Sequence, residues 1–166
     1  MGTWHIIALN SNCAYVGGCS INSPQERWLK SDLAAHPAQC VLAFWHHPRF
    51  TSATGLRENL AVSAFWDDLY AAKADVVLNG HAHVYERFAP QNPSGQADPG
   101  GIREFIVGTG GQNHGTFSTT PRPTIEARDN TAYGVLSLTL MPSGYSWQFL
   151  SDGNSAFSDS GSADCS

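Results

Sequence analysis

The sequence predicts an α/β fold whose central sheet is built from parallel strands. Three short apolar runs, each typical of a buried strand, alternate with two segments that carry the signals of helices. The order strand, helix, strand, helix, strand is that of a layered α/β sheet. With 166 residues, 42% of them hydrophobic, the chain is long enough for one compact domain over residues 1–166 and too short for two domains of ordinary size.

The first strand and the first helix have clear boundaries in the sequence. An apolar run at 4–9 ends in an Asn-Ser-Asn turn, which predicts a buried strand. The helix is expected to begin after Ser23, because serine is a favoured N-cap, Pro24 follows at the first helical position and Glu26 stands three residues after the cap. The sequence His36-Pro37 closes this helix.

The second and third strands are each followed by a histidine. The run 40–45 is apolar throughout, which is typical of a strand buried on both faces, and it stops at His46. A second helix is expected from about residue 58 to 73, and the strand 75–79 ends just before a Gly-His-Ala-His motif.

The pattern changes beyond residue 84. We expect an extended segment at 84–89, then a loop rich in proline and glycine, and a further strand at 102–107. After a loop rich in threonine and proline, the segments 133–140 and 145–150 are predicted to form a hairpin. The polar tail 151–166 is expected to be loose unless Cys165 anchors it.

The four cysteines favour an oxidising compartment. The absence of a Cys-x-x-Cys pair argues against a zinc ribbon. Cys13 and Cys19 flank a small turn, so we expect them to pair and Cys40 to pair with Cys165; four free buried thiols are the alternative. Only 14% of residues are charged, a composition common in secreted proteins. We therefore expect a secreted protein, and, because no export signal precedes the first strand, a natural chain that begins upstream.

The net charge excludes some classes of partner. A charge of -5 gives no support for nucleic-acid binding, which needs clustered Lys and Arg. No apolar run is long enough for a membrane span. A small anionic substrate remains compatible with this charge, because a bound metal supplies local positive charge.

Three histidines are the candidate metal ligands. His46 and His81 follow two strands, and ligands gather outside the carboxyl ends of parallel strands, so the two side chains are expected at one edge of the sheet. His83 stands two residues further on and can turn toward the same point. Three neutral imidazoles suit zinc, or iron or manganese with added oxygen ligands.

Other candidates have a simpler structural interpretation beside the functional one. The glycine-rich segment 108–111 could cradle a phosphate, but no helix or Lys-Ser pair follows, which favours a turn. His114 could swing toward the metal from its loop, although an exposed histidine is the simpler interpretation. His5 and His36 are interpreted as structural. The segment 85–87 offers either a carboxylate near the site or an internal ion pair.

Two ordered motifs carry a resemblance to a known family. The sequence Trp-His-His-Pro-Arg-Phe at 45–50, followed by Asn-Gly-His-Ala-His-Val-Tyr-Glu-Arg at 79–87, resembles the bacterial purple-acid-phosphatase-type branch of the calcineurin-like metallophosphoesterases. The resemblance runs through nearly the whole chain. It implies the C-terminal half of a layered β-sandwich flanked by helices, and an enzyme that hydrolyses small phosphate mono- or diesters at a two-metal site. It also implies that His46 and His81 bind one metal, that His83 binds the other, and that His47 orients a ligand or contacts substrate.

The sequence departs from the family in one respect. It contains no Gly-Asp and no Gly-Asn-His, so the aspartate, asparagine and tyrosine ligands of the family's N-terminal half have no counterpart. Three interpretations follow: a phosphoesterase, a non-catalytic or complementing metal-binding fragment, or a mononuclear histidine-site metalloenzyme with redox chemistry. Half a sandwich exposes apolar strand faces, so a homodimer or association with an N-terminal half is also expected.

Overall fold

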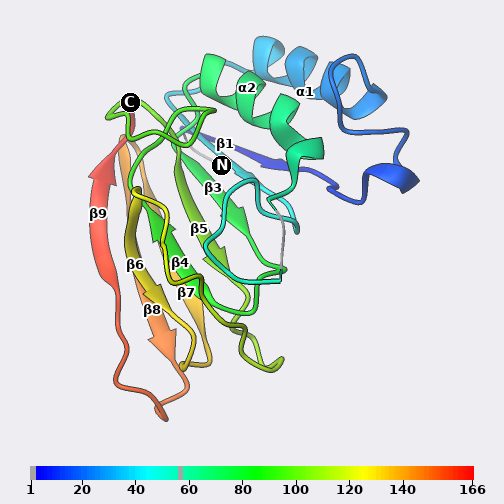
Figure 1. Cartoon of the computed structure of the whole chain (residues 1–166). Coiled ribbons are helices and arrows are strands. Elements are labelled where there is room, and N and C mark those ends of the chain that lie inside the picture. The colour runs from blue at the N-terminus through cyan, green and yellow to red at the C-terminus, as the bar shows by residue number, and fades with distance from the viewer. Residues whose placement is uncertain (1–2, 56–57) are drawn as a thin grey trace.

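A computed structural model describes residues 3–55 and 58–166 of the chain, which form two sheets and two α-helices (Figure 1). The larger sheet has six strands in the order β1-β2-β3-β5-β4-β6, and the smaller has three in the order β7-β8-β9. The helices are α1 (Pro24–Ala35) and α2 (Ser63–Ala71), with 3-10 turns at Cys13–Tyr15 and Leu60–Val62. The strands are β1 (Trp4–Ala8), β2 (Cys40–Phe44), β3 (Val76–Asn79), β4 (Tyr85–Phe88), β5 (Arg103–Val107), β6 (Ile125–Asp129), β7 (Gly134–Met141), β8 (Gly144–Ser151) and β9 (Ser160–Asp164).

The central strands are parallel, as the sequence predicts. β1 pairs with β2, β2 with β3, and β3 with β5, all in parallel. β4 and β6 complete the sheet in antiparallel orientation. The carboxyl ends of β2 and β3 therefore meet at one edge of the sheet, where the histidines follow.

The large sheet is covered on both faces, and alternate residues of each strand point to different layers. Val41 and Val77 belong to a core that also contains Leu29 of α1 and Phe65 of α2. On the opposite face, the core contains side chains of both sheets: Trp4, Cys40, Leu42, Val76, Phe105, Tyr145, Trp147 and Phe149. Figure 1 shows α1 and α2 together on one side of the large sheet and β7 to β9 on the other. The predicted layered sandwich flanked by helices is confirmed.

The second helix is shorter than predicted. The prediction ran from about 58 to 73, but α2 begins at Ser63 after a separate 3-10 turn, because the Asn59 side chain accepts the Ala61 N–H (3.1 Å) and caps that turn. At the other end Lys73 adopts φ 57°, and the Ala74 N–H donates to the Leu69 carbonyl (2.9 Å), a hydrogen bond that closes a helix C-terminus.

Two strands lie where the sequence predicted loops, and both predicted disulfides are confirmed. β6 lies in the segment rich in threonine and proline and pairs with β4. β9 lies in the polar tail, which is held because β9 pairs with β8 and Cys165 is bonded to Cys40. The second disulfide joins Cys13 to Cys19.

Within the described ranges, neither helix is long and apolar enough to cross a bilayer.

Candidate metal centre

Backbone hydrogen bonds between the segments that follow β2 and β3 place the two candidate ligands side by side. The Gly80 N–H donates to the His46 carbonyl (3.1 Å), and the buried Asn79 side chain donates to the Trp45 carbonyl (3.0 Å). The pairing of β2 with β3 thus continues beyond the strands themselves. Because His81 follows Gly80 directly, its side chain is delivered next to that of His46.

His81 occupies a tight turn with an unusual backbone conformation. The Ala82 N–H donates to the Gly80 carbonyl (2.7 Å), which closes a three-residue turn around His81 at φ 61°. A non-glycine residue in this region costs about 1–3 kcal/mol and persists only where the surrounding structure enforces it. Such conformations concentrate at functional sites, so the turn itself supports a functional role for His81.

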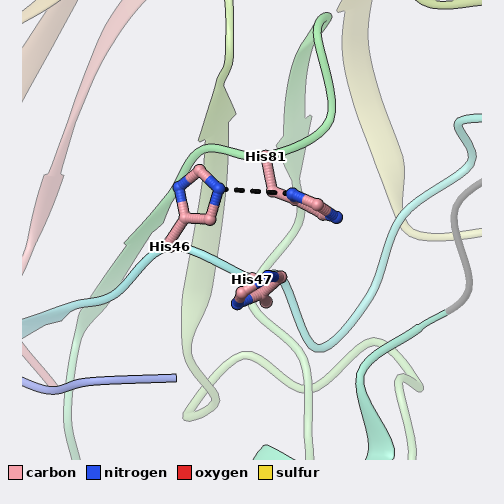
Figure 2. A group of neighbouring side chains, drawn as sticks. All are labelled: His46, His47 and His81. Carbon is pink, nitrogen blue, oxygen red and sulfur yellow. Dashed lines mark hydrogen bonds between the residues drawn. The ribbon is translucent and has the colours of Figure 1, made fainter. Parts of the chain in front are cut away.

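Three imidazole rings gather at this edge (Figure 2). His81 Nδ1 lies 3.2 Å from His46 Nε2, and His46, His47 and His81 each offer a ring nitrogen within 4.8 Å of the others. Ligands at about 2.0–2.1 Å from one ion are separated by roughly 3–3.5 Å, so the close pair of nitrogens fits a single divalent ion. The group contains no carboxylate.

The electrostatic environment favours the neutral form of His47 and His81 by lowering the pKa of each. Burial lowers the pKa of His47, and the neighbouring His46 lowers it further. Burial also lowers the pKa of His81, with added contributions from His47, His46 and His83. A neutral imidazole has the lone pair that a metal needs, and the lowered pKa values of His47 and His81 favour that form at neutral pH.

Ser11, which the sequence did not indicate, holds the ring of His47. The Ser11 Oγ accepts the His47 backbone N–H (3.0 Å) and lies 2.9 Å from His47 Nδ1. If the hydroxyl proton is donated to Nδ1, the Ser11 hydroxyl acts once as acceptor and once as donor, and the proton of His47 resides on Nε2. A serine in the loop after a strand carries no specific signal, so only the three-dimensional fold could reveal it.

The structure does not bring His83 into the group of three. Its Nδ1 lies 3.1 Å from the Asn113 carbonyl, which leaves Nε2 as the free ring nitrogen. A ligand histidine commonly donates its other ring N–H to a backbone carbonyl in this manner. The backbone at Gly108 packs closely against the turn that carries His83, because a Cβ added to Gly108 would overlap the Ala82 carbonyl oxygen.

The remaining candidates lie apart from the three-histidine group. Glu86 is fully buried and accepts hydrogen bonds from Thr51 (2.6 Å) and the Ser52 N–H (2.8 Å). Arg87 pairs with Asp159 (2.7 Å), both largely buried, so the segment 85–87 contributes an internal ion pair through its arginine. Four further candidates have structural surroundings: His114 stacks on Tyr133, Thr109 in the glycine-rich segment donates to the Gly134 carbonyl, and His5 and His36 contact Asp32.

Comparison with known sequences identifies a set of plant enzymes. Purple acid phosphatase 22 of Arabidopsis thaliana is 32% identical over 149 residues, which cover 82% of this chain and 34% of that protein. Purple acid phosphatase 15 of the same plant is 32% identical over 115 residues, which cover 66% of this chain and 21% of that protein. The chain thus spans about a third or less of the length of these relatives. No protein-family model matches it.

Solved structures show the same fold. A purple acid phosphatase, PPD1, isolated from yellow lupin (Lupinus luteus) seeds, aligns with a TM-score of 0.85 at 17% identity, covering 98% of this chain and 31% of that chain. GAP50, the anchor in the inner membrane complex of Plasmodium, aligns with a TM-score of 0.71 at 16% identity, covering 94% and 48%.

The fold is therefore that of the C-terminal part of a calcineurin-like metallophosphoesterase. Within this class the chain is related to the purple acid phosphatases. The narrower assignment to a bacterial branch stays a prediction.

Proposed function

We propose that the chain contributes the histidine side of a metal centre that hydrolyses phosphate mono- or diesters. The observation that carries the proposal is the 3.2 Å approach of His46 Nε2 to His81 Nδ1 at the carboxyl edge of the sheet. Zinc fits these imidazoles, as do iron and manganese once oxygen ligands join them. The relatives named purple acid phosphatases support a small phosphate ester as substrate.

Each histidine has a separate proposed role. His46 and His81 hold one ion, and His83 presents Nε2 to a second, oriented by its contact with the Asn113 carbonyl. His47 is the proposed catalytic residue: with Ser11 Oγ donating to Nδ1, its Nε2 is a hydrogen-bond donor toward substrate oxygens. The metal, when bound, polarises the phosphoryl oxygens of the ester.

The carboxylate ligands of the centre are proposed to come from another polypeptide segment. Apolar side chains support this idea: on the sheet face opposite the helices, Ile6 is 47% exposed and Phe44 is 43% exposed. A pocket of about 260 Å³ lies nearby, lined by Leu78, Val107 and Leu136. An N-terminal half of the family's kind, or a second copy in a homodimer, would cover this face. A monomer by light scattering at micromolar concentration would contradict the homodimer.

The central test measures metal content and aryl phosphate hydrolysis together, with zinc, iron or manganese added, first on the chain alone and then with a polypeptide that carries the family's aspartate and asparagine motifs. His81→Ala is expected to remove the metal held by the three-histidine edge, and the turnover with it. His47→Gln is expected to retain the metal and lose roughly a hundredfold or more in kcat, the range of general acid–base catalysis. Asp67→Asn, which removes an exposed carboxylate of α2, is the control that retains both metal and turnover.

The same measurement separates the two alternatives. A complementing fragment turns over no ester until a polypeptide with the family's aspartate and asparagine motifs is added. A mononuclear enzyme binds about one metal per chain and leaves phosphate esters intact. The two disulfides support the further proposal that the protein is secreted.

A further inference from the structure

A second cluster of metal-ligating side chains lies between β1 and the end of α1. His5 Nε2 lies 2.8 Å from Asp32 Oδ2, and His36 Nδ1 lies 3.1 Å from Asp32 Oδ1. One donor atom from each of the three residues lies within 4.8 Å of the others. The sequence alone indicated only structural roles for the two histidines.

This cluster is separate from the three-histidine edge. His5 pairs in register with Val41 near the start of β2, whereas His46 follows the end of that strand, five residues further on. At about 3.3 Å per residue the two positions are roughly 16 Å apart along the sheet. One ion cannot serve both groups.

The chemistry of the donors suits a divalent cation. Two imidazoles and one carboxylate form a common catalytic or structural set for zinc, and the carboxylate offsets part of the ion's charge. The Asp32 carboxylate lies between the two imidazoles, with Oδ2 2.8 Å from His5 Nε2 and Oδ1 3.1 Å from His36 Nδ1, so it can share one ion with both rings. The three-histidine group, in contrast, offers no negative charge.

The surroundings leave space for solvent ligands. His5, Asp32 and His36 line an open surface pocket of about 570 Å³, bounded on another side by Pro37 and Gln39. The His36 side chain is 65% exposed, so it can adjust its position without disturbing the core. Water can therefore complete a four-coordinate shell, as it does in zinc sites with three protein ligands.

We propose that His5, Asp32 and His36 form a second metal site, which binds Zn²⁺ or a similar first-row divalent cation and ties the edge strand β1 to α1. The hydrogen bonds seen between these side chains occupy the same donor atoms that the ion would use. When the ion binds, any proton on the ligating nitrogen of each imidazole moves to the other ring nitrogen or to solvent. The proposal does not depend on phosphatase activity.

The test uses the full chain with His81→Ala, which removes the first group from the titration. Equilibrium dialysis against Zn²⁺ is expected to give one ion per chain. Adding His36→Gln or Asp32→Asn is expected to weaken that binding at least about tenfold, since loss even of an outer-shell partner has an effect of this size. Asp67→Asn, which removes an exposed carboxylate of α2, is the matched control and is expected to change nothing.

A spectroscopic measurement identifies the ligands directly. Zn²⁺ added to the wild-type chain is expected to shift the imidazole NMR signals of His5 and His36, in addition to those of the three-histidine edge. Unfolding temperatures in chelator check that each variant folds, and the exposed His36→Gln keeps the test valid if Asp32→Asn does not fold. The proposal is overturned if the His81→Ala chain binds no Zn²⁺, or if His36→Gln leaves its Zn²⁺ titration unchanged.

Discussion

At position 81 the glycine variant is expected to be more stable than the alanine variant, which reverses the usual order of these two residues. His81 has φ 61°, a region in which a residue with a Cβ loses roughly 1–2 kcal/mol relative to the right-handed conformation. Glycine avoids this cost but loses about 0.5–1 kcal/mol more conformational entropy on folding than alanine. We therefore expect His81→Gly to be more stable than His81→Ala by about 1 kcal/mol.

The comparison isolates the backbone, because both variants lose the imidazole and its contact with His46. Thermal unfolding in chelator is the assay, and 1 kcal/mol corresponds to about 2–4 °C in Tm for a chain of this size. Asp67 in α2 provides the control, where alanine is expected to exceed glycine by about 1 kcal/mol. If the His81→Ala variant is as stable as the His81→Gly variant, the turn carries no strain, and the argument from strain to a functional role of His81 is wrong.

Three further predictions concern the rest of the fold. Burial, together with the charge of Glu86, raises the pKa of Glu104 well above its usual range. The protonated Glu104 side chain therefore makes its full contribution to stability below about pH 4.5, and this contribution is lost as the pH rises through the raised pKa. As the pH rises from 5 to 8, the free energy of unfolding measured with urea should fall for the wild type relative to Glu104→Gln. The same pH dependence in both proteins would contradict this. Replacing Cys40 and Cys165 by serine removes a bridge between residues 125 apart and should lower the free energy of unfolding by up to about 5 kcal/mol, with the non-reduced mass confirming the loss of the bond. Gly108→Ala should destabilise by about 2 kcal/mol or more in thermal unfolding, because the new methyl overlaps the Ala82 carbonyl; an unchanged Tm would show that the segment yields.

The sequence was sufficient for the parts of the fold that hydrophobic periodicity controls. The apolar runs that became β2 and β3 follow from burial on both faces, and the rule for parallel strands then places His46 beside His81. The cap at Ser23 also predicted the start of α1, where its Oγ accepts the Glu26 N–H.

The remaining features depend on contacts that a single segment does not encode. β9 has the sequence Ser-Gly-Ser-Ala-Asp, which has no apolar alternation and becomes a strand only because β8 offers a paired edge. The separation of His83 from the other histidines depends on the turn at His81 and on the Asn113 carbonyl. The contact of Ser11 with His47 joins residues 36 positions apart, beyond the reach of any local pattern.

The disulfide between Cys40 and Cys165 determines which part of the protein would carry mechanical tension. A force applied between residues 4 and 165 travels along the chain to residue 40 and then through the covalent bridge. Residues 41–164 form a closed loop outside that route, and all four candidate histidines of the metal edge lie within it. In the folded chain the pairing of β1 with β2 resists this force; once β1 has separated, residues 4–40 extend, and the closed loop with the histidine edge stays without tension while the bridge is oxidised.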